Sequence, residues 1–337
     1  MAMSFAIGLP AYKPADFIRQ VALSEQVGFD MVSAGDSAAL IMDSYVALTL
    51  AALNTKTCKL GVFVTNPLVR HPVVAAGAIS SIDVLSNGRA VLGMATGYSG
   101  VANLGMRPST TAALEEYVLA MKSLWATSTA TYQGKTIRMM WARKPVPVYI
   151  TASGPKVLRM AARVADGVMI GTGLTPEIIQ SSLDELEKGA REAGRRVEDI
   201  DVWWFAKGNL GASKEAAGYD IRSGLASSAG LAFSVTLEGK QLPPKLVPAI
   251  KKLMAEYDFT RHVQAGVVRQ AELVDELGLR DYLVERFAIV GTPADWISTI
   301  RKLEKQGVRK LFVAGVMPDR DLFISTLGRE VLPAFKR

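Results

Sequence analysis

VPVYITASGPKVLRMAARVADGVMIGTG, residues 146–173, holds a strand, a helix and a second strand in direct succession. VPVYITAS (146–153) and DGVMIGTG (166–173) are short apolar runs of the length expected for strands. Between them, PKVLRMAARVA predicts a helix with Pro155 at its first helical position. A repeated strand–helix unit of this kind predicts parallel strands joined by helices.

The same alternation continues towards both ends of the chain. KLGVFVT (59–65) is nearly continuously apolar, as expected for a parallel strand that is buried on both faces. Helices are expected between the strands, one capped by Asp43 and another starting at Pro72. Besides the three strands already named, the pattern predicts strands at 5–9, 29–35, 89–96, 201–210 and 310–316.

Eight strands connected in this way predict an α/β fold, a TIM-type (β/α)8 barrel, with an open doubly wound sheet as the alternative. Residues 213–285 are helix-rich but irregular, so we interpret them as a helical insertion between strands 7 and 8. Residues 131–140 predict a hairpin around Gln133 and Gly134. No linker or change of composition interrupts the chain, which predicts one domain over 1–337.

Composition narrows the class of protein. The chain has 337 residues, 49% of them hydrophobic and 21% charged, which suits one α/β barrel with a large core. Its net charge of +7 comes from basic residues interleaved with acids, so a nucleic-acid partner is not favoured. The first residues do not resemble a signal peptide, and no apolar run approaches the roughly 18 residues of a membrane span. We therefore expect a cytoplasmic protein with no membrane partner.

Several common sites have no support in the sequence. The chain contains no GxxxxGK[ST], no HExxH and no GxSxG, and GMATGYSG (93–100) does not fit the GxGxxG pattern. Cys58 is the single cysteine, so an internal disulfide is excluded, and only His71 and His262 could supply imidazole ligands. We predict no metal site.

In a TIM-type barrel the chemistry lies at the carboxyl ends of the strands. Two glycine-containing turns follow predicted strands there, ATGYSG (95–100) and TASGPK (151–156), and glycine lets a backbone approach a ligand closely. The second turn opens a helix whose free amides could hold a phosphate, with Lys156 adding charge. Ordinary capping of a loop is the alternative for both turns. Asp36 and Ser37 end the second strand, where they could cap a turn or contact the ring edge of a cofactor.

Four stretches together resemble one family. LGVFVTNPLVRHP, LGMATGYSGVANLGMRP, ITASGPKVLRMAARVADGVMIGTGLTPE and FAIVGTPADWISTIRKLEKQGVRKLFVAG occur in the order found in the bacterial-luciferase-like superfamily of flavin-dependent oxidoreductases. The chain is most similar to the branch that includes methylenetetrahydromethanopterin reductase and other enzymes of the deazaflavin coenzyme F420. The resemblance covers nearly the whole chain and implies a TIM-like barrel with an insertion before its last strand.

The resemblance also implies site residues. A cis peptide between Phe63 and Val64 would support the cofactor ring at the end of the third strand, next to Thr65 and Asn66. The other positions that match cofactor-binding residues of the family are Asp36, Ala95, Thr96, Gly97, Ala152, Ser153, Gly154, Pro155, Gly171 and Thr172, to which the turn itself adds Lys156. In this interpretation Arg70 and His71 brace the loop rather than react.

The chain departs from the family at two positions. Many relatives have a histidine where Ser37 stands and an acidic residue where Tyr98 stands, and serine is a poor general acid. Asp36, Ser37 and Tyr98 are the catalytic candidates, and either Tyr98 or a group of the substrate handles any proton, or the reaction needs none from the protein.

The function implied is hydride transfer between coenzyme F420 and a small organic substrate. One alternative is a two-component monooxygenase that uses reduced FMN from a separate flavin reductase, and another is a non-catalytic flavin-binding barrel. Relatives are commonly dimers, so we expect a homodimer. His262 lies in the insertion, where it could face the pocket or cap a helix.

Overall fold

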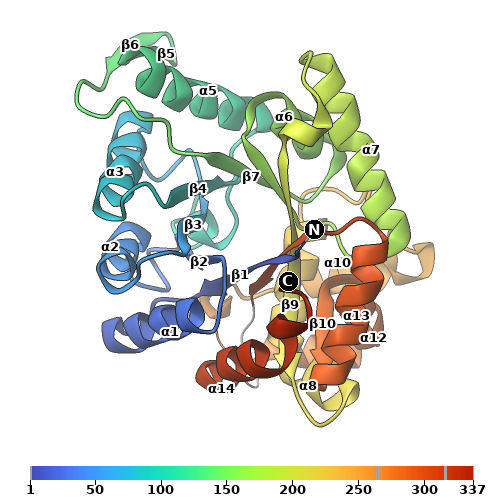
Figure 1. Ribbon diagram of the computed structural model, residues 1–337. Coiled ribbons are helices and arrows are strands. Elements are labelled where there is room, and N and C mark those ends of the chain that lie inside the picture. Colours follow the sequence, from blue (N-terminus) through green and yellow to red (C-terminus); the bar gives the residue numbers. More distant parts are fainter. Residues whose placement is uncertain (1, 263, 265, 267, 315–316, 337) are drawn as a thin grey trace.

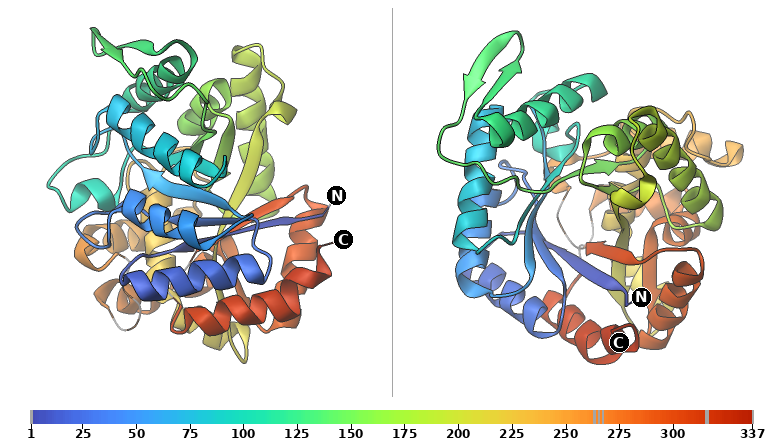
Figure 2. Two further views of the ribbon diagram at one scale, coloured as in Figure 1. Left: turned by 60° about the vertical axis from the view of Figure 1, so that its left-hand side comes forward. Right: turned by 45° about the horizontal axis from the view of Figure 1, so that its top comes forward.

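The computed structural model describes residues 2–262, 264, 266, 268–314 and 317–336 (Figure 1). Eight parallel strands of the described chain close into a barrel inside a ring of helices (Figure 2). Their bounds are β1 Ser4–Leu9, β2 Met31–Ala34, β3 Lys59–Thr65, β4 Ala90–Met94, β7 Val148–Ala152, β8 Gly167–Ile170, β9 Asp201–Leu210 and β11 Lys310–Ala314. Strand β9 pairs with both β8 and β11, which closes the ring. The predicted TIM-type barrel is confirmed, and the doubly wound alternative is wrong.

The strands follow the predicted alternation with two refinements. The last barrel strand was expected to run to residue 316, but residues 315 and 316 lie outside the described part of the chain. A further strand, β10 (Ala288–Gly291), pairs in parallel with Lys207–Leu210 at the carboxyl end of β9. The predicted hairpin is present as β5 (Thr129–Tyr132) and β6 (Lys135–Arg138).

Proline and short polar residues start the outer helices. The Asp43 carboxylate accepts hydrogen bonds from the amides of Tyr45 and Val46 and so caps α2. Proline, which has no amide hydrogen to leave unpaired, stands in the first turn of several others. The outer helices are α1 Pro14–Gln26, α2 Ser44–Asn54, α3 Pro72–Leu85, α5 Thr111–Thr127, α6 Pro155–Val164, α7 Pro176–Glu192, α13 Pro293–Lys305 and α14 Arg320–Thr326.

The barrel strands have a different core on each face. Successive side chains of a strand point to opposite faces, so Trp204 packs in the core between strands and helices while Trp203 fills the barrel interior. The interior is filled by large side chains, Met31, Val91, Tyr149, Met169, Trp203 and Phe312. The barrel is therefore closed at its centre, which leaves the strand ends as the place for a ligand.

The segment predicted as an insertion, residues 213–285, folds largely as helices, and these helices have a core of their own. It contains α8 Lys214–Asp220, α9 Arg222–Phe233, α10 Val247–Ala255, α11 Arg269–Glu276 and α12 Arg280–Phe287. Helix α9 is buried over most of its length, and Leu225, Leu253 and Leu283 lie in this second core. None of the helices among the described residues combines the length and apolar character that a membrane crossing requires.

Candidate functional site

The carboxyl ends of the barrel strands and helix α9 enclose a cavity of about 300 Å³. Residues 227–235 of the insertion form its roof, and Phe63, Phe205 and Phe312 form much of its apolar lining. Many of the residues predicted for the site line this cavity: Asp36, Ser37, Phe63, Val64, Thr65, Asn66, Ala95, Thr96, Gly97, Tyr98, Ser153 and Gly171. The structure therefore brings together predicted residues from the ends of five different strands.

The end of β3 is irregular at the predicted position. The peptide bond between Phe63 and Val64 is cis, and the register with β4 shifts between Val62 and Thr65. The Phe63 ring packs against Phe312 with ring centroids 5.3 Å apart. Glycine makes room for this ring, because a Cβ at Gly93 would lie 2.5 Å from it. The Phe63 ring therefore packs on the side chains of the barrel interior and also lines the cavity above them.

Asp36 belongs to a buried polar network behind the cavity. Its carboxylate accepts a hydrogen bond from the Thr65 hydroxyl at 2.6 Å and from the Arg70 guanidinium at 2.5 Å. Arg70 also donates to Asp43 at 2.5 Å and lies 4.7 Å from the centre of the Tyr45 ring. Arg70 therefore joins the end of β2, the cap of α2 and the end of β3.

His71 caps a helix, and Ser37 lies beside another hydroxyl of the cavity lining. The His71 ring accepts a hydrogen bond through Nδ1 from the Val73 amide at 3.3 Å, so it caps α3. With Arg70, it braces the corner as predicted. The Ser37 hydroxyl lies 3.5 Å from the hydroxyl of Ser99 in the cavity lining.

Tyr98 stands between the cavity and the core of the insertion. Its ring contacts Phe259 and His262 with centroids 4.9 and 5.3 Å away. The hydroxyl is buried and makes no hydrogen bond within the described residues, and a Cβ at Gly230 would come within 1.8 Å of it. Burial raises the pKa of Tyr98, so its hydroxyl can donate a hydrogen bond but is a weak proton donor.

Lys207 and His262 line the cavity without having been assigned a role from sequence. Burial lowers the pKa of Lys207 to about 8. The His262 ring lies with Nδ1 2.7 Å from the Tyr257 hydroxyl, and burial, followed by the charge of Lys207, lowers its pKa to about 3. His262 therefore faces the pocket as a neutral ring, and Lys207 is the cation of this wall.

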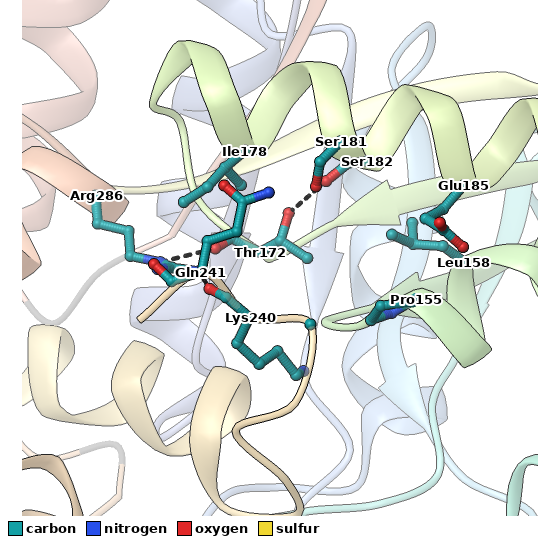
Figure 3. A pocket seen from close by; sticks show the side chains of 11 residues that line it. Pro155, Leu158, Thr172, Ile178, Ser181, Ser182, Glu185, Lys240, Gln241 and Arg286 are labelled. Atoms are coloured by element: carbon teal, nitrogen blue, oxygen red, sulfur yellow. Dashed lines mark hydrogen bonds between the residues drawn. The ribbon is translucent and has the colours of Figure 1, made fainter. Parts of the chain in front are cut away.

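Part of the predicted phosphate turn lines this cavity, and part of it lines a much smaller one, which Figure 3 shows. Ser153 and Gly171 line the larger cavity, whereas Pro155 and Thr172 line the smaller, whose volume is about 20 Å³. Ala152 is buried within β7, and Gly154 is the residue before α6. Lys156 is exposed and lines neither cavity.

In place of Lys156, two cationic side chains further along the chain, Lys240 and Arg286, lie at this turn. The Lys240 ammonium donates to the carbonyl oxygen of Ser153, and a Cβ at Gly154 would lie 2.6 Å from it. Arg286 donates to the carbonyl oxygens of Thr172 at 3.0 Å and Lys240 at 2.7 Å (Figure 3). Burial and the charge of Arg286 lower the pKa of Lys240 to about 8. Sequence analysis missed both residues, because they lie 87 or more positions from Ser153 and carry no motif.

The sequence of this chain is similar to those of known proteins. The family model described as luciferase-like monooxygenase matches residues 3–310. The chain belongs to this family. Within it, the chain is 30% identical to 5,10-methylenetetrahydromethanopterin reductase of Methanolobus tindarius, over 98% of this chain and 100% of the relative. It is 26% identical to F420-dependent glucose-6-phosphate dehydrogenase of Nakamurella multipartita, over 96% of this chain and 94% of the relative.

A solved structure of the family agrees over the whole barrel. The coenzyme F420 dependent tetrahydromethanopterin reductase from Methanopyrus kandleri superposes with a TM-score of 0.80 at 26% identity, covering 100% of both chains. The luciferase-like family is thus shown by sequence and by fold.

Proposed function

We propose that this luciferase-like protein is an oxidoreductase that transfers a hydride between coenzyme F420 and a small organic substrate. Both the dehydrogenase from Nakamurella and the reductase from Methanopyrus are named for dependence on F420. Their substrates differ, so the relatives support the coenzyme more strongly than any particular substrate. When bound, the deazaflavin would supply the carbon that accepts or gives the hydride.

The observation that carries the proposal is a cavity wall that suits a flat ring. Gly35, Ala95 and Gly97 line it with little or no side chain, and Phe63 adds an aromatic ring to the same lining. Gly97 has φ of +108°, and a Cβ there would lie 2.9 Å from the Val101 side chain, so the turn requires glycine. The hydroxyl of Thr151 lines the cavity, buried without a partner in the described chain, and so offers a hydrogen bond to a ligand.

Different groups of residues would bind the ring and the phosphate end of the coenzyme. We assign the ring to Asp36, the turn 63–66 and the turn 95–97, and the phosphate end to the turn 152–155 with Gly171 and Thr172. Lys240 is the best-placed cation for the phosphate end, because its ammonium already lies at Ser153. Lys156, exposed on α6, is left with at most a long-range contribution to that charge.

Asp36, Ser37 and Tyr98 remain the catalytic candidates, and all three line the cavity. Asp36 is held by Thr65 and Arg70, so it shapes the ring's surroundings rather than moving a proton. Ser37 and Tyr98 can donate hydrogen bonds to the substrate. The proton balance of the reaction then falls to the substrate or to solvent.

A two-component monooxygenase using reduced FMN and a separate flavin reductase is the second candidate, and a barrel without catalysis is the third. The family model carries the monooxygenase name, which favours the second over the third. The named dependence of the full-length relatives on F420 favours the first over both.

We further propose a homodimer in the cytoplasm. Helices α2 and α3 lie side by side on one flank of the barrel (Figure 1). Exposed apolar side chains gather on them, including Val46, Leu53, Val74 and Val84. An apolar patch of this kind is typical of a surface that another chain covers. Sedimentation at micromolar concentration tests the dimer.

Binding measurements test the coenzyme. Purified protein is titrated with F420 and with FMN while ligand fluorescence is recorded, and ligand carried through purification is identified by mass spectrometry. We expect F420 to bind at micromolar concentration and more tightly than FMN. Tighter binding of FMN would favour the monooxygenase, and no binding of either would defeat the proposal.

A further inference from the structure

The interior-facing side chains of β9 change from apolar to charged towards the carboxyl end of the strand. Trp203 and Phe205 are apolar, and Lys207 follows at the same alternation and lines the cavity. Its side chain is 7% exposed, and its ammonium lies 5.1 Å from the centre of the Phe205 ring. Within the described part of the chain, the Lys207 ammonium makes no hydrogen bond or ion pair.

Other buried cations in the same region have hydrogen-bond partners, and one of them has a counter-ion. Arg222 on α9, 8% exposed, forms an ion pair with Asp275. Arg286 on α12, 2% exposed, donates to carbonyl oxygens and to the Tyr282 hydroxyl at 2.7 Å. A buried charge is unfavourable unless it is compensated, and Lys207 differs from these neighbours because its ammonium has neither the carboxylate that pairs with Arg222 nor the oxygen acceptors that Arg286 has.

Apart from Asp36, the polar groups that line the cavity with Lys207 can donate hydrogen bonds but carry no negative charge. Ser227 and Ser228 of α9 line the cavity, and the Ser228 hydroxyl is buried without a partner among the described residues. His262 is neutral, and Tyr98 keeps its proton. The one carboxylate in the cavity lining, as far as the structure describes it, is Asp36, which Arg70 already neutralises.

We propose that the substrate of this site carries a carboxylate or phosphate group, and that Lys207 binds this anion with Ser227 and Ser228 as further donors. The proposal rests on the proposed function, because it takes the rest of the cavity as the place of the coenzyme ring. The phosphate end of the coenzyme has other cations, Lys240 and Arg286, so it does not need Lys207.

Calorimetry on the F420-loaded protein tests this with two probes of equal shape, benzoate and benzamide. We expect benzoate to bind the wild type at least about tenfold more tightly than benzamide, because a buried charged pair adds this much. Lys207→Met should remove the difference, and Lys207→Arg should keep part of it. Inorganic phosphate, titrated in the same way, shows which anion is preferred. Lys251→Met, an exposed lysine of α10, is the control and should bind like the wild type.

Measuring the F420 affinity of each variant shows whether a negative result contradicts this inference or the proposed function. Equal binding of benzoate and benzamide by the wild type, or of benzoate by Lys207→Met, overturns the inference and leaves the proposed function intact. Loss of F420 affinity in Lys207→Met also overturns it, because Lys207 would then serve the coenzyme. A wild type that does not bind F420 defeats the proposed function, and the same titrations on the coenzyme-free protein still test Lys207. Should Lys207→Met not fold, as judged by circular dichroism, Lys207→Gln replaces it.

Discussion

The two walls of the cavity differ in how their polar groups are satisfied. On the wall formed by the ends of β2 and β3, Asp36 accepts hydrogen bonds from Thr65 and Arg70, and Arg70 reaches on to Asp43. On the wall formed by β9 and α9, Lys207 has no counter-ion and the Ser228 hydroxyl has no partner within the described residues. We call these the paired wall and the unpaired wall.

The difference indicates which wall is complete before a ligand arrives. A buried network whose charged groups are paired holds its side chains in one arrangement, which suits a binding surface for a rigid ring. Buried groups without partners lose free energy until a ligand supplies those partners. Under the proposed function, the paired wall orients the coenzyme and the unpaired wall selects the substrate.

Breaking the paired wall should have the largest effect. Arg70→Met leaves the Asp36 carboxylate, 3% exposed, without its cation. We expect the free energy of unfolding to fall by about 3 kcal/mol, because an uncompensated buried charge remains. Urea unfolding followed by circular dichroism measures it.

Two matched variants check the cause. Adding Asp36→Asn to Arg70→Met should restore part of the loss, because the charge is then gone. Arg19→Met removes an exposed pair with Asp16 and Asp321 and should change stability little. A loss in Arg70→Met below about 1 kcal/mol would mean that the network contributes little.

The phosphate turn gives the next largest effect, on binding rather than on stability. In Gly154→Val the branched side chain would occupy the place of the Lys240 ammonium. Gly154 has an extended backbone that valine can adopt, so the fold should persist. We expect F420 affinity to fall about a hundredfold, because close backbone approach and a charged hydrogen bond are both lost. Lys156→Met should change the affinity less than about twofold. Unchanged affinity in Gly154→Val would place the phosphate elsewhere.

The unpaired wall should respond to pH. Lys207, with a pKa lowered to about 8, binds an anion only while protonated, so benzoate affinity should be constant below pH 7 and fall as pH rises through 8. His262, with a pKa near 3, and Tyr98, with a raised pKa, do not titrate in this range. Calorimetry between pH 6.5 and 9.5 should show about a tenfold loss for each pH unit above 8. Lys207→Arg should abolish this pH dependence of benzoate binding. Lys240→Met is the control: it changes another lysine with a pKa of about 8 and should retain the pH dependence.

Much of the paired wall could be predicted from the sequence, and little of the unpaired wall could. Strand ends, proline starts and the Asp43 cap are local signals, so they placed Asp36 and Thr65 at one barrel face, whereas Phe63 came from the resemblance to the family. The contributions of α9 and Lys240 depend on how an irregular insertion folds back over that face, which no periodic pattern encodes. Lys207 had a usable signal, because it follows Trp203 and Phe205 at strand alternation.

The smallest expected effect also sharpens the comparison. The Tyr98 hydroxyl is buried without a partner in the described chain, so Tyr98→Phe removes no hydrogen bond, and unfolding free energy should stay within about 0.5 kcal/mol. Tyr149→Phe is the matched control, because its hydroxyl donates to Asp201 at 2.6 Å and its loss should cost about 1.5 kcal/mol or more. If Tyr98 belongs to the unpaired wall, Tyr98→Phe should weaken benzoate binding severalfold although stability is unchanged. A destabilisation equal to that of Tyr149→Phe would show that the hydroxyl already has a partner, and the distinction between the walls would then not extend to Tyr98.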